Sequence, residues 1–197
     1  MLADVNIFDS YFFGLEGFIV IAVIVILSSV IVQFRKKVSG KYLIEKIEQL
    51  DQNTYQHIAN VPFQQLEQKI DHIILSTYGI FIIERKNYNG HIFGDLDDKQ
   101  WTFQVKKNKQ LIDNPITALK VKFAHIAEEL DLQEKNIYPI IAFSNSAKLK
   151  VDQKLINQYV ANYDDINEAI RFYQTPKLSK EKIAELFKLL ETMKTNK

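Results

Sequence analysis

The chain contains no cysteine, and its first 34 residues contain no lysine or arginine. Without cysteine, disulfides and thiolate metal sites are excluded, and a reducing compartment fits. The histidines show no metal-ligand spacing, and the chain has neither internal repeats nor a low-complexity tract. The 197 residues, 47% of them hydrophobic and 12% aromatic, suffice for one domain of ordinary size with a real core and some chain left over.

The net charge of +1 conceals an asymmetry along the chain. Residues 1–34 carry Asp4, Asp9 and Glu16 but no basic residue. All 25 basic residues therefore follow position 34 together with 21 of the 24 acidic ones, which gives that part a net charge of +4. Such a mild excess permits a polyanionic partner without demanding one.

Residues 12–34 predict a transmembrane helix in contact with the lipid bilayer. The uncharged run 17–34 has about 18 residues, the usual minimum for a spanning helix. Arg35-Lys36-Lys37 follow at once, so we expect residues 1–11 outside the cell membrane, 35–38 as a basic juxtamembrane linker and the remaining domain in the cytoplasm. A cleaved signal peptide is the first alternative, but the segment has neither the positively charged start nor the small-residue cleavage site that such a peptide needs. A buried core helix is the second alternative, but it does not explain the basic residues that follow at once.

The soluble part predicts an α/β fold with a mixed sheet. Helical spacing covers 40–50, and strand patterns cover 55–61, the two halves of 71–86, 91–94 and 101–105. Asn114-Pro115 predicts the start of a helix that ends near Leu130. A buried strand over 137–143 and two amphipathic helices over 166–173 and 179–193 complete the chain.

The segment DHIILSTYGIFIIERK, residues 71–86, predicts a β-hairpin with chemistry at its open end. If Leu75 pairs with Ile80, then Asp71 falls opposite Glu84, because paired residues share one face of a sheet. Lys86 shares that face, since it lies two residues beyond Glu84. Two facing carboxylates repel each other, so a divalent metal would give a reason for the arrangement, as in a metal-dependent phosphodiesterase.

The run QKIDHIILSTYGIFIIERKNYNGHIFG, followed by Trp101 and Asn114-Pro115-Ile116, resembles the nuclease-related domain (NERD) family over about residues 39–193. The resemblance implies a restriction-endonuclease-like mixed sheet flanked by helices, and nucleic acid as partner, with DNA favoured over RNA. It also implies that Asp71 and Glu84 bind Mg²⁺ or Mn²⁺, while Lys86 orients the attacking water or stabilises the phosphorane. Mg²⁺ prefers oxygen ligands and keeps several waters, so two carboxylates and a phosphate oxygen suffice.

The chain departs from the family pattern at three positions. The acid that usually follows a glycine at the start of the first helix is Lys41 here, and Glu45, one turn on, is a candidate additional acid. A usual glutamine before the Ile-Asp-His run is Lys69, and the one after Asn-Pro is Ala118.

Basic residues supply candidate nucleic-acid contacts at Lys69, Lys106, Lys107 and Lys109. Three hypotheses stay open. The retained Asp71, Glu84 and Lys86 favour a membrane-anchored metal-dependent nuclease, and Lys41 favours a non-catalytic module of the same fold that binds nucleic acid or protein at the membrane. A membrane scaffold that only mediates protein contacts predicts no coherent acidic pocket at the hairpin.

Overall fold

The structure is a computed structural model that describes residues 15–64, 66–67 and 69–195, without the side chains of 15, 16 and 32–39. The chain divides into two units, Met1–Gly40 and Lys41–Lys197, each considered by itself. The predicted segment 1–11 lies outside the described residues. Within the described part, no helix has a stretch that is both long and apolar enough to cross a membrane.

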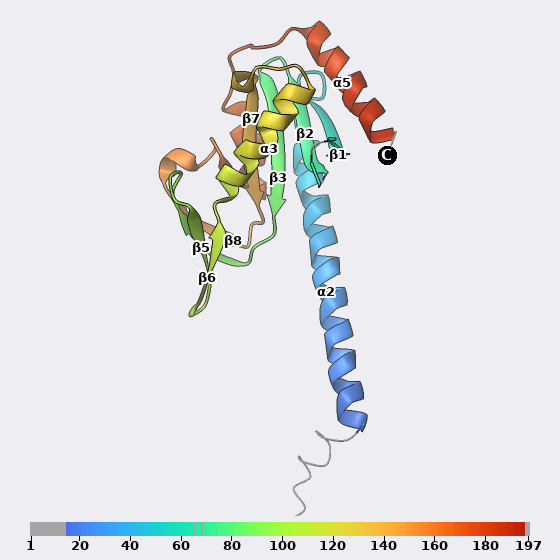
Figure 1. Ribbon diagram of the computed structural model, residues 1–197, viewed down its shortest axis with the longest axis vertical. Helices are drawn as coiled ribbons and strands as arrows, with labels where there is room; N and C mark the ends of the chain where they lie inside the picture. The colour runs from blue at the N-terminus through green and yellow to red at the C-terminus, as the bar shows by residue number, and fades with distance from the viewer. Residues whose placement is uncertain (1–14, 65, 68, 196–197) are drawn as a thin grey trace, which may run out of the picture. The chain divides into compact units, whose positions relative to one another are not determined.

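The second unit has an α/β fold built on two mixed sheets (Figure 1). Sheet A has the order β1-β2-β3-β7-β9, and sheet B the order β6-β5-β4-β8. The parallel neighbours are β3 with β7, β7 with β9 and β4 with β8, and all other neighbours are antiparallel. The strand bounds are β1 Gln56–Val61, β2 Ile70–Ser76, β3 Gly79–Lys86, β4 Gly90–Gly94, β5 Gln100–Val105, β6 Asn108–Asp113, β7 Ile137–Phe143, β8 Ala147–Val151 and β9 Val160–Asn162.

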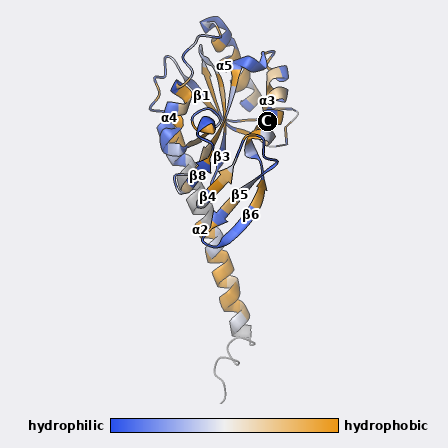
Figure 2. Ribbon diagram, turned by 90° about the vertical axis from the view of Figure 1, so that its left-hand side faces the viewer, coloured by the Kyte–Doolittle hydropathy of each residue, from blue (hydrophilic) through white to orange (hydrophobic). Residues whose placement is uncertain are grey.

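Helices pack on both faces of sheet A and match most of the predicted helices. Their bounds are α2 Leu15–Ile47, α3 Pro115–Glu129, α4 Ile166–Arg171 and α5 Lys180–Thr195. Short 3₁₀ turns cover Glu134–Asn136, Gln153–Leu155 and Tyr163–Asp165. The hydropathy colours show the apolar residues following the central strands, while the surrounding loops are mostly hydrophilic (Figure 2).

The β2–β3 hairpin has the predicted register. Ile73 pairs with Ile82 and Leu75 with Ile80, and a two-residue turn joins the strands. Gly79 follows this turn with φ +144°, and a Cβ there would lie 2.4 Å from the Tyr138 ring, so only glycine fits.

Sheet A is buried on both faces, which explains the nearly continuous apolar runs in β2 and β3. One face packs against α3, α5 and the inner face of sheet B, through residues such as Ile82, Leu119 and Trp101. The other face packs against the end of α2 and against α4, through residues such as Phe81, Leu43 and Ile166. The strand order and both cores therefore fix the β2–β3 hairpin at the centre of the domain.

The sequence prediction missed three strands. Strands β6, β8 and β9 were not predicted, because β6 is largely exposed, β8 carries alternating lysines and β9 has only three residues. The predicted single mixed sheet is in fact two sheets, because β4 pairs with β5 and β8 and not with a strand of sheet A.

Asn114 begins helix α3 as predicted and also holds a distant turn. Its Oδ1 accepts from the backbone N–H groups of Ile116 (2.9 Å) and Thr117 (3.4 Å), an N-cap that the following proline suits. Its Nδ2 donates to the carbonyls of Asp95, Leu96 and Asp98 in the β4–β5 connection. One buried side chain thus joins sheet B to the first turn of α3.

Buried His72 of the hairpin and partly buried His57 of β1 form a pair. His57 Nε2 lies 3.0 Å from His72 Nδ1 across β1 and β2. Burial, with a contribution from Lys194, lowers the pKa of His57 to about 4. Burial, with contributions from His57 and Arg85, lowers the pKa of His72 to about 3. Both rings are therefore neutral at pH 7.

Acid should destabilise the fold through this pair. As pH falls below about 6.5, both histidines are protonated in the unfolded chain but stay neutral in the folded chain. The stability due to this pair is therefore fully present above pH 6.5 and decreases as pH falls toward about 4. The expected slope is about 1.4 kcal/mol per pH unit for each histidine. His57→Gln should halve it in denaturant titrations between pH 7 and 4, and an unchanged slope would contradict the assignment.

Candidate functional site

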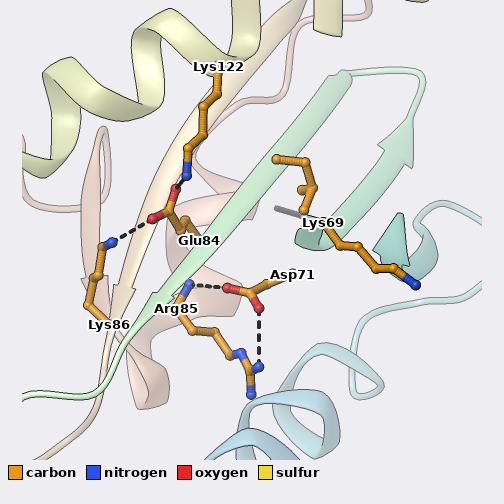
Figure 3. A pocket seen from close by; sticks show the side chains of 7 residues that line it. Lys69, Asp71, Glu84, Arg85, Lys86 and Lys122 are labelled. Atoms are coloured by element: carbon orange, nitrogen blue, oxygen red, sulfur yellow. Dashed lines mark hydrogen bonds and ion pairs between the residues drawn. The ribbon is translucent and has the colours of Figure 1, made fainter. Parts of the chain in front are cut away.

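A small cavity of about 150 Å³ lies at the open end of the β2–β3 hairpin (Figure 3). Four basic and two acidic side chains line it, which leaves two net positive charges. The lining residues are Lys69, Ile70, Asp71, Glu84, Arg85, Lys86 and Lys122. The hairpin supplies most of them, and α3 supplies Lys122.

Glu84 is held between two ammonium groups. Lys86 Nζ donates to its Oε1 at 2.5 Å, and Lys122 Nζ donates to its Oε2 at 2.8 Å. Lys86 reaches Glu84 because residues two apart on a strand share a face. Lys122 reaches it from helix α3, which packs over that face. The glutamate thus fixes both lysine side chains inside the cavity.

Asp71 is held separately, by Arg85. The Arg85 backbone N–H donates to Asp71 Oδ2 at 2.9 Å, and its guanidinium donates to Oδ1 at 3.1 Å. The sequence places Asp71 opposite Glu84, but the recorded register ends one pair earlier, at His72 and Ile83. Figure 3 shows the two groups as neighbours: Asp71 with Arg85, and Glu84 with its two lysines.

The lysines decide the charge state of Glu84. Burial alone raises the pKa of this carboxyl, which is only 17% exposed. The hydrogen bonds from Lys122 and Lys86 outweigh burial and hold the pKa below its usual value. Glu84 is therefore ionised at neutral pH, and its charge partly neutralises a basic cavity.

The structure brings together Asp71, Glu84 and Lys86, the three residues proposed from the sequence as the catalytic group. Lys69 also lines the cavity, but its ammonium points away from both carboxylates in Figure 3. Glu45, the candidate additional acid, does not line the cavity. Its Oε1 lies 3.5 Å from Nζ of Lys41 in an exposed ion pair one helical turn apart.

The other candidate nucleic-acid contacts lie on sheet B. Lys106 and Lys107 form the tip of the β5–β6 hairpin, where Lys106 has φ +55°, and Lys109 lies on β6. They do not line the cavity.

Sequence reasoning missed two cavity residues, Arg85 and Lys122. Arg85 follows Glu84 directly, so strand alternation places it on the opposite face, and the sequence pattern does not show that both its backbone N–H and its guanidinium donate to Asp71. The sequence does contain a signal that could have identified Lys122 as a cavity residue. It lies four residues after Ala118, hence on the same side of the helix, one turn beyond a family glutamine.

The cavity offers oxygen ligands for a metal, but all of them are engaged. Two carboxylates suit Mg²⁺, which is commonly held by one or two carboxylates with water and phosphate. The described residues contain no cluster of three or more His, Cys, Asp or Glu side chains arranged for a metal. Each of the four carboxylate oxygens accepts from a nitrogen, so a metal ion would have to replace some of these donors.

Comparison with known proteins identifies the family. The nuclease-related domain matches residues 37–144, so the chain belongs to the nuclease-related domain (NERD) family. An uncharacterized protein of Bacillus anthracis is 28% identical over 177 residues, which cover 86% of this chain and 83% of that protein. No solved structure matches the chain. The matched segment contains every cavity residue.

Removing Lys122 should weaken the fold mainly above the ordinary pKa of Glu84. A carboxyl with a depressed pKa adds stability at higher pH and loses it as pH falls through that pKa. Lys122→Met should therefore lower the free energy of unfolding at pH 7 by about 1–2 kcal/mol, with a smaller loss at pH 3. Urea titrations measure both, and Lys188→Met on exposed α5 is the control. An equal loss at both pH values would contradict the argument.

Proposed function

We propose that the chain is a membrane-anchored nuclease-like protein whose cavity acts on phosphodiester bonds of nucleic acid, with DNA as the first candidate. The observation that carries the proposal is the convergence of Asp71, Glu84 and Lys86 on one cavity. Membership of a nuclease-related family supports a nucleic-acid role.

Each cavity residue has a chemical task in this proposal. The net positive lining attracts a phosphate, and Lys86 and Lys122 are placed to donate charge-assisted hydrogen bonds to its oxygens. Asp71 and Glu84 would hold a Mg²⁺ or Mn²⁺ ion, which when bound lowers the pKa of a water and neutralises charge on the phosphate. Arg85 keeps the Asp71 carboxylate oriented through two hydrogen bonds.

The direct test is cleavage of DNA or RNA by the full chain in detergent micelles with Mg²⁺ or Mn²⁺. Asp71→Asn and Lys86→Ala should each lower the rate by about 10²–10³-fold, as expected when one group that stabilises developing charge is lost. Thermal unfolding should show that both variants remain folded. Lys135→Ala, an exposed lysine away from the cavity, is the control and should cleave like the wild type. Equal cleavage by wild type and both site variants would sink the assignment.

A non-catalytic module is the second candidate, and one observation favours it. All four carboxylate oxygens are held by lysine or arginine donors, and exposed Lys41 stands where the family has an acid. Such a cavity binds phosphate without cutting. Salt-sensitive binding without cleavage by wild type would establish this alternative. The scaffold hypothesis is weaker, because both acids do line a cavity at the hairpin.

We further propose that residues 12–34 anchor the protein in the cell membrane, with the N-terminus outside and the domain in the cytoplasm. The support is the uncharged sequence run with its basic stop, together with exposed apolar side chains in α2. Phe18 is 68% exposed and Ile24 59%, for example. Water disfavours such a surface, whereas hydrocarbon accepts it.

Charges inserted in this segment should release the protein from membranes. Ile24→Lys with Leu27→Lys places two ammonium groups in the apolar run, at a cost of about 2.5–3.5 kcal/mol each. Vesicle flotation should recover the wild type with lipid and this double variant without it. Val121→Lys, an equally exposed apolar position in α3, is the control and should float. A wild-type chain that stays in the soluble fraction would refute the anchor.

A further inference from the structure

The outer face of sheet B carries two aromatic side chains with lysines on both sides of them. The register defines a first row across the four strands, Lys148-His91-Gln104-Lys109, and a second row, Lys150-Phe93-Thr102-Leu111. Residues paired in register share a face, so these eight side chains point the same way. We call them the sheet B platform.

The opposite face of sheet B belongs to the core, which fixes the platform toward solvent. Trp101 and Ile92 are fully buried, and Phe103 packs against the same cluster. Phe93 on the platform is 37% exposed and Leu111 63% exposed, while Lys109, Lys148 and Lys150 are exposed. Strands β5, β6 and β8 lie together beside the larger sheet in Figure 1.

Two aromatic rings stand in the middle of the platform. His91 and Phe93 lie on β4, with ring centroids 6.0 Å apart and planes inclined by 20°. An exposed large ring flanked by a second, nearly parallel ring offers a flat surface on which bases stack. A duplex keeps its bases stacked on each other, so such a surface suits unpaired bases.

The charge of the platform fits a polyanion. Three lysines lie at its two sides, and none of them has an ion pair with a carboxylate in the described part of the chain. Lys106 and Lys107 extend the basic edge at the hairpin tip. Asp113 follows Leu111 at the far end of β6, where Gln100 donates to it.

We propose that the sheet B platform binds single-stranded nucleic acid, with bases stacked on Phe93 and His91 and phosphates contacted by Lys109, Lys148 and Lys150. This surface is distinct from the cavity, so the inference goes beyond the proposed function and does not require cleavage. Two of the three lysine contacts come from β8, which lies after the segment matched by the family.

The test measures binding of the full chain, in detergent micelles with EDTA, to labelled DNA and RNA single strands of about 16 nucleotides. Each lost phosphate contact lowers the salt slope by about 0.7, so Lys148→Ala with Lys150→Ala should lower it by about 1.4. Phe93→Ala should weaken binding about tenfold and leave the slope unchanged. Lys135→Ala with Lys188→Ala removes the same charge elsewhere and should leave the slope intact.

The outcomes separate this inference from the proposed function. The cleavage rate of Asp71→Asn decides the proposed function, whereas the binding and salt slope of the platform variants decide this inference. Unchanged binding by the folded platform variants, or tighter binding of duplex than of single strands, would overturn the inference even if the wild type cleaves. Loss of binding in the platform variants supports it even if the wild type does not cleave. Binding of a protein partner with no affinity for oligonucleotides would also overturn it.

Discussion

The pairing of β3 with its two neighbours is the constraint on which the rest of the domain depends. β3 lies between antiparallel β2 and parallel β7, and its apolar part is buried on both faces. No water can satisfy the backbone there, so both ladders must form completely. The last three residues of the strand then leave the core, and these are Glu84, Arg85 and Lys86. Three of the cavity side chains are thus held by a strand that is paired on both sides.

The cavity is an electrostatic compromise between two acids and four cations. Glu84 alone would be costly to bury as an anion, and two neighbouring lysines alone would repel each other. Packed together, the three side chains form an ordered group, and the hydrogen bonds from the lysines hold the pKa of Glu84 below its usual value. In the proposed function, a phosphate would meet lysines whose positions the glutamate has already set, which would reduce the entropy lost on binding.

Much of this arrangement follows from local sequence, and the remainder depends on contacts between distant segments. The hairpin register was predictable because apolar alternation and turn residues agree, and the start of α3 because Asn-Pro is a local signal. The Asp71 bond to Arg85 was not, since a strand pattern cannot show a carboxylate turning toward a backbone N–H at the end of the ladder. Lys122 was missed because it reaches Glu84 from 38 residues away. Strands β8 and β9 were missed because their sequences have no clear strand pattern and each forms by pairing in parallel with a strand far away in the sequence.

Asn114 connects two parts of the domain that lie apart in the sequence. Its amide grips three carbonyls of the β4–β5 connection, while its oxygen holds the first turn of the helix that carries Lys122. The small sheet and the helix that carries Lys122 are therefore joined through hydrogen bonds of this side chain. Breaking these bonds, as in Asn114→Ala, would leave polar backbone groups of both segments without their partner.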